Sequence, residues 1–291
     1  MGWLQIMMWW INKEPMEISE HKMAEIFDNI RKLYRFARPC PELADYIEFF
    51  SESSAEETYQ YAGNNRFTVR MFPSWTPTCY INLGQPYQLV VGSAQYQIQQ
   101  HTDVLILRNN IVERHNLPTD HIFTIKFFPG GLEAILGINQ AQFSDQVVKL
   151  EVILPATLLH RIKQLTEFEE RVELLQHFFL SQYKKKSPNS YYVSVVQKAI
   201  DIYGAGNMEL TSGQLAGELF ITNKTIYRYF TRVIGTTPKQ YFATVRARAA
   251  LAAYVANKNL FSPYEHGYYD MSHFYKDVIR FTGRKLIENA S

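Results

Sequence analysis

The chain of 291 residues exceeds the usual size of one domain, so we expect two. Its 46% hydrophobic and 14% aromatic residues are enough for packed cores and exclude a disordered chain. The net charge of +2 is unevenly spread, because residues 191–291 hold 12 Lys and Arg against 7 Asp and Glu and residues 1–190 are left at −3. This excess suits a C-terminal domain that faces a polyanion, and it also suits an ordinary solvated surface.

Cysteine usage and the first residues bear on location. Only Cys40 and Cys79 are present, which excludes a disulfide framework and lacks the spacing of a zinc site, so we expect a reducing cytoplasm. Residues 1–11 are apolar, but they have no basic residue ahead of the apolar run and are too short to span a bilayer. We therefore expect neither a secretory signal nor a membrane partner. Met16 and Met23 are alternative starts, which leaves open whether residues 1–15 belong to the native protein.

The N-terminal half changes from a helical to a strand pattern. Residues 17–32 place Met23, Ile26, Phe27 and Ile30 at helical spacing and predict a short amphipathic helix. From about Tyr34 the chain breaks into β-branched and aromatic runs separated by turn residues. These runs cover 66–72, 78–83, 87–91, 96–99, 103–107 and 121–128. Short strands at this spacing predict a β sandwich or barrel.

Helices are expected after the strands. The strand pattern stops at Pro129-Gly130-Gly131, where a short helix with Leu132, Ile135 and Leu136 facing a core begins. Residues 158–181 read as one or two helices, with inward positions at Leu158, Ile162, Leu165, Val172, Leu175 and Phe179. Residues 184–190 have the composition of a linker. The expected division is a tail and short helix (1–32), a β-rich sensor or regulatory domain with trailing helices (33–183), the linker (184–190) and a helical domain (191–291).

The helical domain carries a first helix-turn-helix pattern. After a helix at about 193–203, Thr211 and Gln214 have the spacing of a capping box at the start of a short helix that ends near Phe220. Thr222 then caps a second helix from 223 to about 234, and Gly235 ends it. Two helices with so short a turn are typical of the motif, although any small α-hairpin can look similar.

A long helix leads from this unit to a second one. Thr237 followed by Pro238 predicts a cap and a first helical residue, and the helix runs to about 256. Its apolar stripe is expected at Phe242, Val245, Ala249, Ala252 and Val255. About eighteen residues at roughly 1.5 Å each give a rod of about 27 Å. Such a rod can hold two helices in successive major grooves, which lie roughly 34 Å apart.

The second unit is expected to begin with Ser262 as cap and Pro263 as the first helical residue. Gly267 makes its turn, and Asp270 caps a helix from Met271 to Arg280. Phe274, Val278 and Phe281 form the inward face of that helix. We call the helices that follow Thr222 and Asp270 the reading helices. The predicted fold class is α+β, with a β-rich sandwich or barrel-like domain followed by an all-α domain of two helix-turn-helix units joined by a long helix.

The motifs resemble those of AraC/XylS-type transcription regulators. Residues 267–278, closing in Arg280-Phe-Thr-Gly283, are similar to the second helix-turn-helix signature of that family. Leu215-Ala216, residues 225–230 and residues 235–241 with Arg246 resemble its first unit and linking helix. Residues 41–48 and 125–132 are similar to a sensor-like domain often fused to this module in bacteria. The chain departs from the pattern at Pro263, at Leu286 and at Phe220-Ile221.

The resemblance and the position of each helix name the DNA-binding candidates. They are Lys224, Thr225, Tyr227 and Arg228 in the first reading helix, Thr237 and Lys239 at the start of the linking helix, and Met271, Ser272, His273, Tyr275 and Lys276 in the second reading helix. Arg228 suits a bidentate contact to guanine or a phosphate contact. The less favoured alternative is that Arg228 braces the domain through a carboxylate. Ile226, Phe230 and Val233 are expected in the core.

A metal or anion site is weighed against ordinary structural roles. His101, His115 and His121 lie among the strands without a regularly placed acidic partner, so scattered or hydrogen-bonded histidines are favoured over metal ligands. The Pro129-Gly130-Gly131 turn lacks the lysine and serine of a phosphate loop, which favours a structural turn. We expect no catalytic residues, no metal and no cofactor.

The leading hypothesis is a sequence-specific DNA-binding transcription regulator. Its expected partner is double-stranded DNA, and the candidate partners are a small-molecule effector, a second copy of the chain and RNA polymerase. The alternatives are a metal- or ligand-dependent β-barrel enzyme with an accessory helical module, and an interaction protein that has lost DNA binding. No Ser/His/Asp arrangement supports the enzyme.

Overall fold

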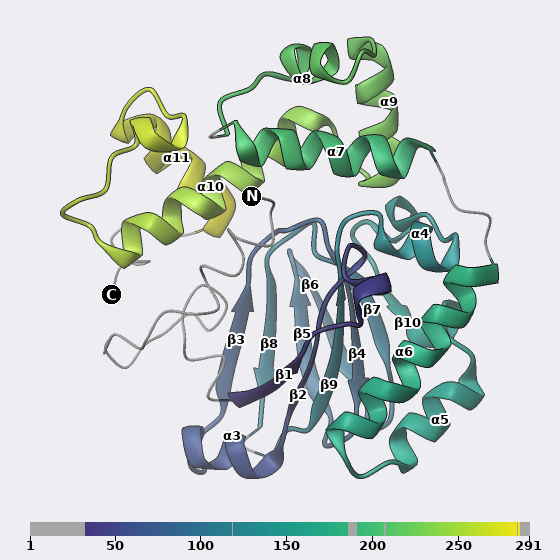
Figure 1. The fold of residues 1–291 in the computed structure, drawn as a ribbon. Helices are drawn as coiled ribbons and strands as arrows, with labels where there is room; N and C mark the ends of the chain where they lie inside the picture. The colour runs from purple at the N-terminus through teal and green to yellow at the C-terminus, as the bar shows by residue number, and fades with distance from the viewer. Residues whose placement is uncertain (1–32, 118, 186–190, 207, 284, 286–291) are drawn as a thin grey trace.

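The computed structural model shows a β-rich domain followed by a region of helices (Figure 1). It describes residues 33–117, 119–185, 191–206, 208–283 and 285. The helix expected over 17–32 and residues 186–190 of the expected linker lie outside the described residues. The exact boundaries of the two domains therefore stay a prediction.

The β-rich domain is a sandwich of two antiparallel sheets. The six-stranded sheet has the order β1-β2-β9-β4-β7-β10, and the four-stranded sheet has the order β3-β8-β5-β6. The strands of the first sheet are β1 Tyr34–Ala37, β2 Ile47–Ser53, β9 Ile122–Phe127, β4 Pro77–Asn82, β7 Val104–Leu107 and β10 Val147–Lys149. Those of the second are β3 Phe67–Met71, β8 Val112–Asn116, β5 Tyr87–Val91 and β6 Ala94–Ile98.

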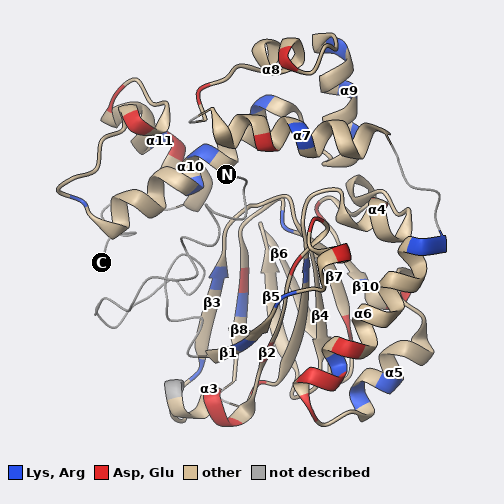
Figure 2. Ribbon diagram, viewed as in Figure 1, with Lys and Arg blue, Asp and Glu red and all other residues tan. Residues whose placement is uncertain are grey.

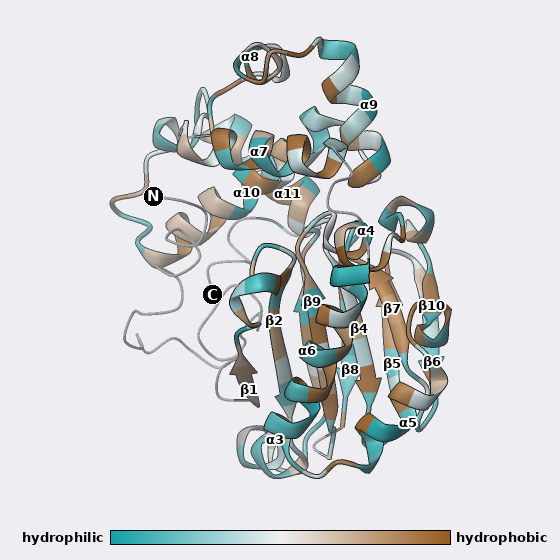
Figure 3. Cartoon of the chain, turned by 45° about the vertical axis from the view of Figure 1, so that its right-hand side comes forward, coloured by the Kyte–Doolittle hydropathy of each residue, from teal (hydrophilic) through white to brown (hydrophobic). Residues whose placement is uncertain are grey.

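Two cores explain the pattern of apolar residues in the strands. On β4, Cys79 and Ile81 pack toward the helices that cover the six-stranded sheet, whereas Tyr80 packs toward the four-stranded sheet. β7 alternates in the same way, with Leu105 facing the helices and Ile106 facing the other sheet. Strands covered on both faces need apolar residues at successive positions, and β7 is accordingly hydrophobic along its length (Figure 3).

Helices cover the outer face of the six-stranded sheet (Figure 1). They are α4 Gly131–Leu136, α5 Ala156–Gln164 and α6 Phe168–Lys185, with α3 Ala55–Ala62 and the 3-10 turns η1 Pro41–Leu43, η2 Gln140–Phe143 and η3 Leu150–Val152 in the connections. The helix predicted after Gly130 is confirmed as α4, and residues 158–181 form parts of two helices. Gly131 is required because a Cβ there would lie 2.2 Å from the Tyr46 carbonyl oxygen.

The helical region contains α7 Tyr191–Ala205, α8 Ser212–Glu218, α9 Asn223–Val233, α10 Pro238–Ala256, the 3-10 turn η4 Tyr264–His266 and α11 Met271–Thr282. Helices α7, α8 and α9 share one core with the first turns of α10, and the rest of α10 shares another core with α11. The expected apolar stripe of α10 is wrong in part: Phe242 and Ala252 are buried, but Val245, Ala249 and Val255 are only partly buried. The helix packs on two partners, so its buried positions do not form one stripe. Among the described residues, no helix is long and apolar enough to cross a membrane.

Candidate nucleic-acid interface

The first helix-turn-helix unit is built from local hydrogen bonds. Thr211 and Gln214 form the predicted capping box of α8, and the Thr222 hydroxyl accepts a hydrogen bond from the Thr225 amide at 3.1 Å to cap α9. In the turn, the Phe220 amide donates to the Gly217 carbonyl at 3.0 Å. The short turn between α8 and α9 and the caps of both helices therefore agree with the sequence prediction.

The packing of α9 decides which of its side chains face solvent. Ile226, Phe230 and Val233 are buried, as predicted, against α7 and α8. Lys224, Tyr227 and Arg228 are consequently exposed, and Thr225 is half-buried. The guanidinium carbon of Arg228 lies 5.3 Å from the centre of the Tyr229 ring. Among the described residues Arg228 makes no ion pair, so the bracing role through a carboxylate has no support.

The second reading helix, α11, is arranged in the same way. The Asp270 carboxylate accepts a hydrogen bond from the His273 amide at 2.7 Å and caps the helix. Phe274, Val278 and Phe281 are buried, as predicted. Met271, Ser272, His273 and Lys276 are exposed at its N-terminal half, while Tyr275 is half-buried.

The second unit differs from the expectation in its first helix. Pro263 is an N-cap rather than the first helical residue, and the segment that follows is the three-residue turn η4. Gly267, with φ of 67°, ends this turn, and the Tyr268 amide donates back to the Pro263 carbonyl at 3.1 Å. So early a glycine in the left-handed conformation leaves no room for a second helical turn.

The linking helix α10 begins and ends as predicted. Thr237 caps it by accepting a hydrogen bond from the Gln240 amide at 3.2 Å, with Pro238 at the first position, and Lys239 is exposed. Its 19 residues give a length of roughly 28 Å. Arg246 ties α10 to α11, since its guanidinium lies 3.3 Å from the Asp277 carboxylate and over the Tyr268 ring at 4.7 Å.

Charge is distributed unevenly over the helical region. Residues 219–264 contain seven Lys and Arg and no Asp or Glu. Figure 2 shows no acidic position on α9 or α10, and the acidic positions that the structure describes in this region lie on α7, α8, α11 and nearby loops. This stretch holds the first reading helix and the linking helix, so both carry a positive local field.

The C-terminal end of α9 is docked on the β-rich domain. The buried Gln140 side chain donates from Nε2 to the carbonyl oxygens of Ile234 and Trp75, each at 3.0 Å, and accepts from the Gly130 amide at 2.8 Å. Arg232 lies 3.7 Å from the Glu133 carboxylate. The end of the first reading helix is therefore held by a polar bridge to the loops around α4.

The C-terminal end of α11 is docked on the same domain by different contacts. Arg70 of β3 donates from Nη2 to the Thr282 carbonyl at 2.8 Å. The rings of Phe72 and Phe281 stack with centres 5.2 Å apart. Both reading helices thus rest on the β-rich domain by their C-terminal ends, while the predicted contact residues lie toward their N-terminal ends.

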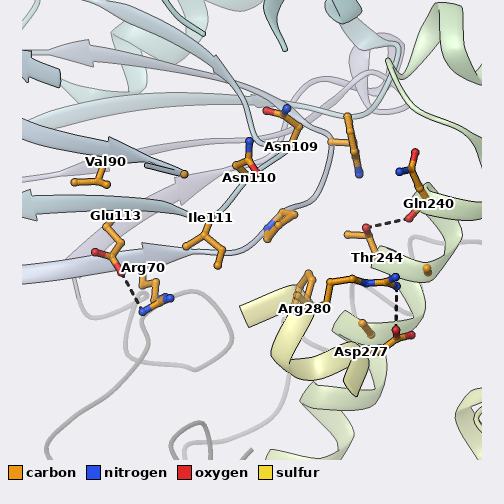
Figure 4. A pocket seen from close by; sticks show the side chains of 16 residues that line it. Arg70, Val90, Asn109, Asn110, Ile111, Glu113, Gln240, Thr244, Asp277 and Arg280 are labelled. Carbon is orange, nitrogen blue, oxygen red and sulfur yellow. Dashed lines mark hydrogen bonds and ion pairs between the residues drawn. The ribbon is translucent and has the colours of Figure 1, made fainter. Parts of the chain in front are cut away.

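A cleft of about 410 Å³ lies between the β-rich domain and helices α10 and α11 (Figure 4). Its walls carry charges of both signs, with Arg70 paired to Glu113 at 3.0 Å and Arg280 paired to Asp277 at 2.9 Å. Sequence reasoning missed this cleft, because its residues come from distant strands and helices and share no sequence pattern.

The three histidines singled out in the sequence have separate partners. His115 is hydrogen-bonded to Thr68 at 3.0 Å, and His121 Nε2 lies 3.0 Å from the Glu52 carboxylate. Lys163 donates to the His101 carbonyl. Within the described part of the chain, no three His, Cys, Asp or Glu side chains gather as metal ligands.

The chain is similar to solved structures, each at a TM-score below 0.5. One is ToxT from Vibrio cholerae, at 12% identity and a TM-score of 0.42, with 78% of this chain and 97% of that chain covered. A second ToxT structure, from Vibrio cholerae O395, has 9% identity and a TM-score of 0.44, covering 78% of this chain and 96% of that one. The AraC-like transcriptional activator CuxR has 14% identity and a TM-score of 0.27, covering 77% and 88%.

No protein-family model and no curated protein matches the chain. At this identity and with TM-scores below 0.5, these similarities carry no argument, and we take the fold and the function from the chain's own residues.

Proposed function

We propose that the protein is a sequence-specific DNA-binding transcription regulator of AraC/XylS type. The observation that carries the proposal is the pair of capped reading helices, each buried along one side and exposed at its N-terminal half, joined by a helix of roughly 28 Å. Helices so spaced suit successive major grooves of one DNA face.

Within this function the two reading helices have different contacts. Arg228 and Lys224 of α9 suit guanine edges and phosphates, and Thr225 and Tyr227 complete that surface. Met271, Ser272, His273, Tyr275 and Lys276 form the surface of α11. At the start of α10, the half-buried Thr237 and the exposed Lys239 suit a phosphate between the two grooves.

The β-rich domain is proposed to sense a signal or to mediate dimerisation. The cleft between this domain and α10–α11 is the place where a small polar effector would touch both parts of the protein. A ligand that bound there would change DNA binding only if it favoured one arrangement of the two parts. A second copy of the chain and RNA polymerase remain proposed partners.

Selection of bound sites from random double-stranded DNA tests the proposal. We expect the full chain to enrich a bipartite site whose two elements lie about one helical turn apart. Its affinity should fall steeply with salt, because phosphate contacts release counterions. A library without enrichment, or enrichment of a single undivided element, would contradict the assignment of two reading helices.

A further inference from the structure

An exposed aromatic side chain precedes each reading helix. Phe220 is 96% exposed and lies two residues before the cap Thr222, and Tyr269 is 83% exposed and lies directly before the cap Asp270. The two turns differ in sequence and in the helix that leads into them. An exposed ring at the start of both reading helices is therefore a feature that packing within the units does not explain.

The backbone conformation of Phe220 is unfavourable for a phenylalanine. Its φ is 54°, in the left-handed region that glycine and asparagine tolerate and that other residues occupy at a cost. The conformation is held in place, because the amides of Phe220 and Ile221 donate to the carbonyls of Gly217 and Ala216 at 3.0 and 2.9 Å. A ring that is almost wholly in water returns none of that cost through burial.

The surroundings of Phe220 favour DNA as the group that covers the ring. Glu218 is the last acidic residue before the stretch 219–264, which has seven basic residues and no acidic one. Lys224 and Arg228 are exposed on the helix that begins three residues after Phe220. The charge around the ring therefore complements a polyanion.

We propose that Phe220 packs against the methyl group of a thymine and the adjoining deoxyribose at the edge of the major groove that α9 reads, with Tyr269 in the matching position for α11. The thymine methyl is the apolar feature of the major groove, and aromatic side chains are suited to contact it. This inference rests on the proposed DNA-binding function. It names a determinant of base preference that lies outside the reading helices themselves.

Operators in which single thymines are replaced by deoxyuridine test the contact on the full chain. One replacement at the flank of the first element should weaken binding of the wild-type protein about fivefold, within the usual range for a base contact. The Phe220→Ala variant should bind the thymine operator about fivefold more weakly and be insensitive to that replacement. Leu260→Ala is the matched control, because Leu260 is 78% exposed in a loop outside both turns. It should behave as the wild type.

A second variant separates binding from folding. Phe220→Asn relieves the left-handed backbone, so its thermal midpoint should be unchanged or higher while its DNA affinity falls as in Phe220→Ala. Unchanged operator affinity in both variants would overturn the inference even if Arg228→Ala lost binding. Unchanged affinity combined with reduced transcription by purified RNA polymerase would overturn it as well, by assigning the ring to a protein partner. If the wild-type chain bound no DNA, the proposed function itself would fail.

Discussion

Among the residues that the structure describes, Arg228 has no carboxylate partner, unlike three other arginines of the helical region. Arg232 lies within ion-pair distance of Glu133, and Arg246 and Arg280 lie within ion-pair distance of Asp277. The guanidinium of Arg228 instead lies over the Tyr229 ring. We expect Arg228→Ala to weaken specific DNA binding by about 1–3 kcal/mol, because it removes a side chain free to pair with a base or phosphate. A footprinting titration on the selected site measures the change.

Lys276 provides the comparison within the second reading helix. It is exposed on α11, but Asp270 and Asp277 lie on the same element and reduce the local positive charge. We expect Lys276→Ala to cost less affinity than Arg228→Ala, measured on the same DNA at the same salt concentration. Equal losses would show that the two units contribute alike.

Asp120 predicts a pH dependence inside the β-rich domain. Burial raises the pKa of its carboxyl to about 6, and the nearby Arg114 guanidinium and the Leu117 amide only partly oppose the shift. Because folding raises the pKa of this carboxyl, the folded state favours its protonated form. The free energy of unfolding therefore falls as the pH rises from about 4 to about 6. Asp120→Asn should remove that loss, which reaches at most about 3 kcal/mol. Urea unfolding of both proteins from pH 4 to 7 measures the difference, which stays constant with pH if the carboxyl does not titrate there.

At the scale of elements, local chemistry made the reading helices predictable. Helices α8, α9 and α11 have the threonine and aspartate caps and the apolar spacing that the sequence predicted. Such features can be predicted because a cap and an apolar repeat depend only on residues a few positions apart. Strands β1, β2, β8 and β10 were not predicted. In β8, the buried Arg114 donates a hydrogen bond to Asn116 and packs over the Tyr80 ring of a distant strand, so this strand has no continuous apolar pattern in the sequence.

The second unit was predicted with the wrong first helix for the same reason. A capping serine and a proline at the first position indicate a helix, but Gly267 ends the turn after three residues and Tyr268 folds back under Arg246. The docking sites of α9 and α11 were equally invisible, since Gln140 and Arg70 reach partners about 90 and 200 residues away. Contacts of this kind depend on the tertiary fold and not on local pattern.

Arg246 carries a prediction for the pair of elements α10 and α11. Without the Arg246 side chain, the largely buried Asp277 carboxylate keeps only its ion pair with Arg280, and the Tyr268 ring loses the guanidinium that covers it. We expect Arg246→Ala to destabilise the second unit by about 1–3 kcal/mol. Hydrogen exchange should show lost protection in α11 with little change in α9. Lys239→Ala, an exposed cation on the same helix, is the control, and equal loss of protection in both units would contradict a local role.

For the whole molecule, the β-rich domain serves as a common support for the two reading helices. Gln140 holds the end of α9, and Arg70 with Phe72 holds the end of α11. The linking helix sets the distance between the units, while these contacts restrict how each unit rotates about it. Under the proposed function, a change in the β-rich domain can therefore alter how the two helices are placed for DNA without changing the proposed contact residues.

Removing the contacts that hold one of the two helices on the β-rich domain should therefore make DNA binding less sensitive to the spacing between the two elements of the site. Gln140→Ala removes the bridge from Gly130 and Trp75 to the Ile234 carbonyl. Relative to the wild type, we expect a smaller loss of affinity when the two elements of the site are moved one base pair apart, because the first unit can rotate to follow its groove. Gln95→Ala, an exposed glutamine on β6, should keep the wild-type penalty. Identical penalties in all three proteins would mean that the linking helix alone fixes the geometry.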